Sequence, residues 1–180
     1  MSKTILVTYA SRTGTTASVA EAIGNTLIEC GVRAVVWPMA QVSDVSSYHA
    51  VVAGSAIRYE QWLPEAMEWL RMHRYALAQR PFAAYLVCMT QAIPKDDWRK
   101  EAGIPNWLKG VRALVKPVSE GYFAGSLDID RVASPADRLK FQLSVWSGVW
   151  SEGDHRDWDA IRAWTLELPA KLELQASSSA

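Results

Sequence analysis

Residues 3–16, KTILVTYASRTGTT, decide the fold of this chain. The stretch begins with an almost continuous apolar run, Ile5 to Val7, which is typical of a strand covered on both faces in a parallel sheet. It then changes to small hydroxylated residues around Gly14. Beyond this break, apolar residues recur every four positions from Val19 to Leu27. The stretch therefore predicts a strand, a polar loop and a helix N-terminus in direct succession.

The polar loop is a candidate anion-binding site. The first backbone N–H groups of a helix have no partner inside it, and the helix dipole favours negative charge there. Hydroxyl groups add donors without adding charge, and Gly14 lets the backbone approach a ligand closely. The loop residues are Ser11, Arg12, Thr13, Gly14, Thr15 and Thr16. The structural alternative is that Ser and Thr often cap helices and that Gly is common in turns.

Two common phosphate motifs are absent from this position. The sequence contains no G-x-x-x-x-G-K-[ST] and no G-x-G-x-x-G after the first strand, which excludes a P-loop nucleotidase and an ordinary dinucleotide fold. Residues 11–16 instead resemble the [ST]-x-T-G-x-T phosphate loop of flavodoxins, which holds the phosphate of FMN. The resemblance implies a flavodoxin-like three-layer α/β sandwich with FMN as the cofactor. Its five-stranded parallel sheet would have the order 2-1-3-4-5, with helices on both faces.

The remaining sequence alternates between strand and helix patterns, as a parallel α/β sheet requires. Four further apolar segments are predicted as strands, at residues 32–37, 50–55, 81–89 and 118–123. Helical periodicity is found over residues 64–75, from Asp96 or Asp97 to about 114, and from 158 to about 174. Pro169 is expected to kink or shorten the last helix.

Two later loops should face the same ligand as the first, because ligands bind beyond the carboxyl ends of parallel strands. Tyr59 and Trp62 could stack on a flat ring, or could merely cover the following helix. Arg58 is either solvated or placed over an anion or an electron-rich ring. By resemblance to flavodoxins, Ala56, Ile57, Arg58 and Tyr59 contact the isoalloxazine ring of FMN. The same resemblance gives Met89, Thr90, Gln91 and Ala92 contacts at the edge of that ring.

Residues 128–157 form an unusual insertion before the last helix. Within it, residues 136–146 are predicted as a helix that is apolar around much of its circumference. Trp146 and Trp150 would mark a ligand surface or a membrane interface if they are exposed, and simple packing if they are buried. We therefore expect a single domain over residues 1–175, with an insertion at about 128–157 and a disordered tail at 176–180.

Four short segments extend the resemblance to menaquinone-dependent protoporphyrinogen IX dehydrogenases. They are Ile57-Arg58-Tyr59, Ala124 to Asp128, Ala136 to Trp150, and Trp158 to Ile161. This resemblance implies an FMN-dependent oxidoreductase that acts on a flat apolar molecule, a porphyrinogen or a quinone. Two alternatives remain: a flavodoxin-type electron carrier that docks on a redox protein, and a flavin-free protein-interaction module. The complete phosphate loop argues against the last, because an interaction module has no need of one.

Composition narrows the range of partners. The 180 residues include 19 basic residues (Lys and Arg) and 19 acidic residues (Asp and Glu), so the formal charge is zero. No strong attraction to nucleic acid follows, and the neutral charge counts against a carrier, since carrier flavodoxins are typically acidic. Two cysteines and no apolar run near 20 residues favour a reducing, cytoplasmic location, with peripheral membrane contact left open. No histidine or cysteine pattern suggests a metal site.

Overall fold

The computed structural model describes residues 3–92 and 103–173. Its centre is a parallel sheet with the strand order β2-β1-β3-β5-β6. This order corresponds to 2-1-3-4-5 when only the parallel strands are numbered, so the predicted topology is confirmed. The strands are β1 (Thr4–Ala10), β2 (Arg33–Pro38), β3 (Ala50–Arg58), β5 (Phe82–Cys88) and β6 (Ser119–Ala124).

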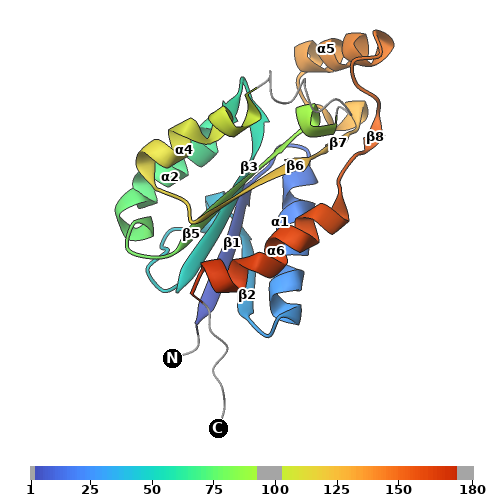
Figure 1. Ribbon diagram of the computed structural model, residues 1–180. Helices are drawn as coiled ribbons and strands as arrows, with labels where there is room; N and C mark the ends of the chain where they lie inside the picture. The colour runs from blue at the N-terminus through green and yellow to red at the C-terminus, as the bar shows by residue number, and fades with distance from the viewer. Residues whose placement is uncertain (1–2, 93–102, 174–180) are drawn as a thin grey trace.

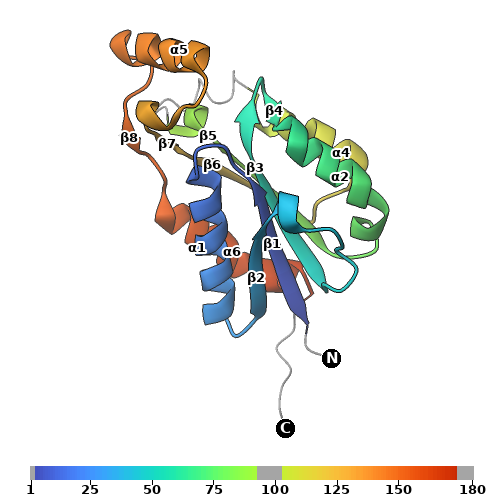
Figure 2. The same cartoon turned by 180° about the vertical axis from the view of Figure 1, so that it is seen from behind.

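Helices cover both faces of this sheet, which confirms the predicted three layers (Figures 1 and 2). One face carries α1 (Thr15–Glu29) and α6 (Trp158–Lys171), and the other carries α2 (Pro64–Leu77) and α4 (Lys109–Leu114). Two short 3₁₀ helices, η1 (Met39–Gln41) and η3 (Ile104–Leu108), lie in the connections. The helix predicted to begin at Asp96 or Asp97 starts outside the described residues.

Each face of the sheet has its own apolar core. Leu6 and Val51 belong to the cluster under α2, whereas Ile5 and Val52 belong to the cluster under α1 and α6. Adjacent residues thus point to opposite faces, and both faces are covered, which explains the continuous apolar runs of β1 and β3.

Tyr85 of β5 is fully buried in the second of these clusters, beside Phe123 and Trp164. Its hydroxyl has no hydrogen-bond partner among the described residues, and burial raises its pKa far above the ordinary value. An unpaired buried hydroxyl costs roughly 1–3 kcal/mol. We expect Tyr85→Phe to raise the free energy of unfolding by about 1 kcal/mol. Urea denaturation would measure this change. A clear loss of stability in Tyr85→Phe would show that the Tyr85 hydroxyl does have a hydrogen-bond partner.

Within the described ranges, three short strands lie outside the five parallel strands. β4 (Gln61–Trp62) pairs antiparallel with the end of β3, which the sequence did not predict. In the insertion, β7 (Ser126–Leu127) and β8 (Gly153–Asp154) pair antiparallel as a separate hairpin. Between them lie η4 (Ile129–Arg131) and α5 (Pro135–Trp146), and the latter confirms the helix predicted at 136–146.

The insertion projects beyond the carboxyl ends of the parallel strands. Figures 1 and 2 both show α5 outside the three layers at that end of the molecule. The side chain of Ser134 accepts a hydrogen bond from the Asp137 N–H and caps the helix. None of the residues of α5 is buried. The helix therefore contributes little to the core and lies exposed at that end of the molecule.

The end of the chain differs in part from the prediction. Pro169 does not end α6, which continues to Lys171. Pro169 lies in the last turn of α6. Its missing N–H therefore removes only one hydrogen bond, and the helix has only two more residues to form after it. The tail predicted at 176–180 lies outside the described residues. No helix in the described part of the chain is long and apolar enough to cross a bilayer.

Candidate functional site

The loop at residues 11–14 has the geometry of an anion cradle. Gly14 is left-handed, with φ of 88°, and precedes the first turn of α1. Its N–H donates to the Ser11 hydroxyl at 3.0 Å, which closes the loop. Gly14 and Thr13 are exposed at the carboxyl end of β1. The free backbone N–H groups of α1 therefore open toward solvent at this point.

Thr16 provides a test of whether this loop suits a phosphate. It lies in the first turn of α1 and is 1% exposed, yet its hydroxyl has no partner among the described residues. A buried hydroxyl is normally hydrogen-bonded, so an unpaired one at a helix N-terminus is consistent with a missing acceptor. A phosphate oxygen is such an acceptor. The residues present thus fit the phosphate predicted from the sequence.

Two other side chains of the loop are bound by residues of neighbouring elements. Arg12 forms a bidentate ion pair with Glu65 of α2, with both N···O distances at 3.1 Å. The guanidinium holds the pKa of the Glu65 carboxyl below its usual value. The Thr15 hydroxyl lies 2.8 Å from the Ser126 hydroxyl at the start of β7. These contacts anchor the loop to α2 and to the insertion.

The segment after β3 forms a tight hairpin with β4. Ile57 pairs with Trp62, and the two turn residues, Tyr59 and Glu60, have φ of 49° and 60°. Positive φ at both central residues is the type I′ pattern that matches the twist of the strands. The Ser55 hydroxyl accepts the Leu63 N–H at 3.0 Å and supports the base of the hairpin.

The hairpin separates the two aromatic rings that were predicted to stack on a ligand. Tyr59 is 75% exposed at the tip, so one ring is free. Trp62 is 2% exposed and packs in the core cluster under α2. This burial corrects the expectation that Trp62 stacks on a ligand. The Trp62 side chain points from β4 into the core, where its ring supports the hairpin. Ala56 and Ile57 are partly buried and pack against the same cluster.

Arg58 joins the hairpin to the insertion. Its Nη2 lies 3.3 Å from Asp137 Oδ2 in α5, and its guanidinium lies 5.2 Å from the centroid of the Tyr59 ring. Asp137 also faces Lys140 at 3.8 Å. The solvated alternative for Arg58 therefore does not hold in this structure. The ion pair places the first turn of α5 beside the predicted ligand crevice.

The third predicted loop begins at η2 (Met89–Ala92), directly after β5. Met89, Thr90, Gln91 and Ala92 are all partly buried. Cys88 at the base of the loop receives backbone N–H groups from Thr90 and Gln91, but burial raises the pKa of its thiol to about 11. The thiol is therefore protonated and unreactive at neutral pH. The continuation of the loop at 93–102 lies outside the described residues.

An exposed apolar stripe follows one side of α5 and the turn after it. Leu139, Leu143 and Trp146 are spaced four and three residues apart, which puts them on one face of the helix. Trp146 is 87% exposed, and Leu139, Leu143 and Val149 are each more than half exposed. Trp150, in contrast, packs against Phe141 with ring centroids 5.5 Å apart. Of the two tryptophans in question, only Trp146 is free.

The structure thus unites three loops at one edge of the sheet, and it adds residues that sequence analysis missed. Glu65, Ser126 and Asp137 each bind a predicted site residue from a distant segment. No local motif marks them, because each is an ordinary polar residue in its own element. No group of acidic, histidine or cysteine side chains in residues 3–92 and 103–173 could hold a metal ion.

Solved structures with a related fold include two flavodoxins. The flavodoxin of Fusobacterium nucleatum bound to flavin mononucleotide is 12% identical, with a TM-score of 0.54 over 94% of this chain and 99% of that one. A short-chain flavodoxin associated with a non-canonical PDU bacterial microcompartment is 14% identical, with a TM-score of 0.52 over 81% and 98%. At these identities the likeness shows the fold.

Sequence comparison gives a more direct assignment. No curated protein matches the chain. The profile of the family described as the flavodoxin domain matches residues 6–155. The match begins in β1, includes the phosphate loop and extends through the β7–β8 hairpin of the insertion. The chain therefore belongs to the flavodoxin domain family.

Proposed function

We propose that this protein is an FMN-dependent oxidoreductase that accepts a flat apolar substrate at α5, in the manner of protoporphyrinogen IX dehydrogenase. The observation that carries this proposal is the exposed stripe of Leu139, Leu143 and Trp146 on α5, the helix whose first turn binds Arg58 of the hairpin. An exposed apolar patch at the rim of a site is typical of a surface that binds an apolar partner. A porphyrinogen or a quinone has the flat, apolar shape that such a surface would bind.

The described residues have distinct tasks in this proposal. The loop of Ser11, Thr13, Gly14 and Thr16 would hold the phosphate of FMN. Residues 56–59 and 89–92 would flank the isoalloxazine ring, with the exposed Tyr59 as the stacking face. FMN supplies the redox chemistry when it is bound, while the protein supplies binding and orientation. No acid or base from the chain is required if the substrate's hydrogens pass directly to the flavin.

The Arg58–Asp137 ion pair holds α5 beside the proposed cofactor site. It joins the hairpin beside the ring site to the first turn of the helix that carries the stripe. Leu139 follows Asp137 by two residues, about 200° around the helix, so the stripe lies on the face of α5 turned away from this pair. The same stripe would meet the bilayer surface if the quinone is membrane-bound.

Substitution of the stripe tests the proposal. Leu143→Gln with Trp146→Gln should raise KM for protoporphyrinogen or a menaquinone analogue at least about tenfold, because a buried apolar side chain contributes roughly 1.5–3 kcal/mol. FMN binding should be unchanged. Met72→Gln, which alters an exposed apolar residue of α2, is the matched control. An unchanged KM in the double variant would contradict the role of the stripe.

An electron-carrier function is the second candidate, because solved flavodoxins share the fold. It predicts rapid electron exchange with a redox protein and no turnover of porphyrinogen or quinone. The formal charge of zero provides no general electrostatic attraction to a basic partner. Stopped-flow reduction of the FMN-loaded protein by each class of donor would distinguish the carrier from the oxidoreductase.

A further inference from the structure

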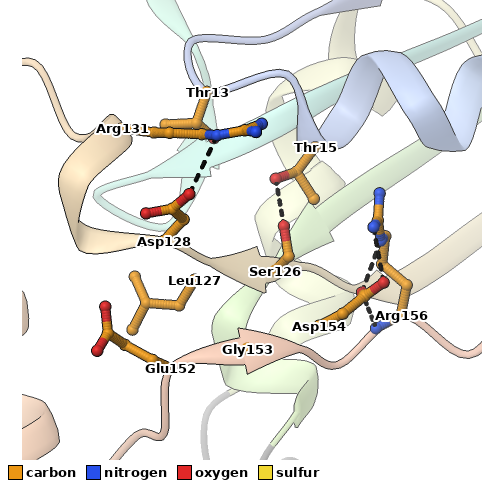
Figure 3. Close-up of a pocket in the computed structure, with 10 residues that line it drawn as sticks. All are labelled: Thr13, Thr15, Ser126, Leu127, Asp128, Arg131, Glu152, Gly153, Asp154 and Arg156. Atoms are coloured by element: carbon orange, nitrogen blue, oxygen red, sulfur yellow. Dashed lines mark hydrogen bonds and ion pairs between the residues drawn. The ribbon is translucent and has the colours of Figure 1, made fainter.

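A cavity of about 350 Å³ lies between the phosphate loop and the β7–β8 hairpin (Figure 3). Its size is at the lower end of the range for small-molecule sites. The loop contributes Thr13 and Thr15, and β7 together with the insertion contributes the other lining residues. These are Ser126, Leu127, Asp128, Arg131, Glu152, Gly153, Asp154 and Arg156. A ligand group held in the loop would therefore have one side open to side chains of the insertion.

Most charged groups of this cavity already have partners. Arg156 donates to both carboxylate oxygens of Asp154 at 2.7 Å and donates a further N–H to the Ser18 hydroxyl. Its guanidinium holds the pKa of Asp154 below the usual value. Glu152 Oε1 accepts the Ile129 N–H at 3.3 Å. Arg156 thus has little capacity left for a ligand.

Arg131 is different, because its ion pair uses only one part of the guanidinium. Its Nε lies 3.1 Å from Asp128 Oδ2, while Asp128 Oδ1 accepts the Asp130 N–H at 3.1 Å. The two Nη groups of Arg131 have no partner among the described residues. Arg131 and Thr13 of the loop line the same cavity (Figure 3). Asp128 therefore holds the Nε of Arg131 and leaves its two terminal donors available at the cavity that the loop also lines.

We propose that Arg131 donates from its Nη groups to the phosphate of FMN in the loop, and that Asp128 orients it for this contact. The planar fork of a guanidinium matches two phosphate oxygens, and hydrogen bonds between charged groups are the stronger kind. The pairing with Asp128 neutralises the net charge but leaves the donors available. The insertion would thus help the protein to select a phosphorylated flavin over riboflavin. This inference rests on the proposed FMN cofactor.

The test compares FMN with riboflavin, which lacks the phosphate. Arg131→Ala should weaken FMN binding about tenfold, an effect at the low end for a charge-assisted hydrogen bond because the side chain is well exposed. Riboflavin affinity should not change. Arg131→Lys keeps the charge but lacks the planar fork of the guanidinium. Its affinity for FMN should lie between that of the parent protein and that of Arg131→Ala. Asp128→Asn should weaken FMN binding by less, through loss of orientation. Flavin fluorescence titration at fixed ionic strength measures each dissociation constant.

Lys140→Ala is the matched control, since it removes an exposed cation of the insertion that does not line the cavity. It should leave both affinities unchanged. Equal weakening of FMN and riboflavin by Arg131→Ala, or no weakening at all, would overturn the role of Arg131 while the FMN cofactor stands. Failure of the parent protein to bind either flavin would instead refute the proposed function, and this inference with it.

Discussion

Replacement of Gly14 by valine is expected to abolish FMN binding. Gly14 has φ of 88°, a conformation that costs a β-branched residue roughly 1–3 kcal/mol. No atom lies within 4 Å of a Cβ placed there, so the effect would come from the backbone and not from a clash. The loop would relieve the strain by moving, and its N–H groups would no longer converge on a phosphate. Visible absorption after incubation with FMN and gel filtration measures the loss.

Gly31→Val is a control at the other end of the same helix. Gly31 follows α1 with φ of 78°, and a Cβ at this position would likewise have no atom within 4 Å. This variant should lose a similar amount of stability in urea denaturation but retain FMN. If Gly14→Val bound FMN as well as Gly31→Val does, the phosphate would not lie in the loop at residues 11–16.

Replacement of Gly54 by alanine should cause the largest loss of stability. A Cβ at this position of β3 would lie 2.0 Å from Cζ of the Tyr85 ring. Tyr85 is fully buried and contacts the rings of Phe123 and Trp164, so its ring cannot move aside cheaply. Overpacking of a core typically costs 1–3 kcal/mol, and a contact this short should lie at or above the upper end, about 3 kcal/mol. The midpoint of urea unfolding measures the effect.

A second variant separates this clash from a general effect of Gly54. Gly54→Ala combined with Tyr85→Val should recover part of the stability that is lost in Gly54→Ala, relative to the sum of the two single variants. Such a positive interaction energy is expected only for residues in contact. Additive losses, or an unchanged midpoint in Gly54→Ala, would contradict the packing of β3 against β5.

The parts of the fold that the sequence predicted are those with strong local patterns. The apolar runs of β1 and β3 reflect burial on both faces, so their type is evident without knowledge of their neighbours. The helix α5 begins after Ser134 and Pro135, a recognisable start signal. The strand order, in contrast, came from the resemblance of residues 11–16 to a known loop.

The parts that it missed depend on contacts between distant segments. The turn at Tyr59 and Glu60 lacks the Asn-Gly or Gly residues that usually mark a hairpin, so β4 could not be foreseen. The Arg58–Asp137 pair joins residues 79 positions apart. Spacing in the sequence carries no signal for such a pair. Its existence requires the fold first.

The most direct test of the whole account is a titration of the purified protein with FMN, followed by gel filtration and visible absorption. We expect stoichiometric FMN to remain with the protein, with flavin bands altered from those of free FMN because the ring is flanked by protein. An absence of retained flavin, in both the oxidised and the reduced state, would contradict the account. The chain would then be a flavodoxin-like module that binds a partner without a flavin.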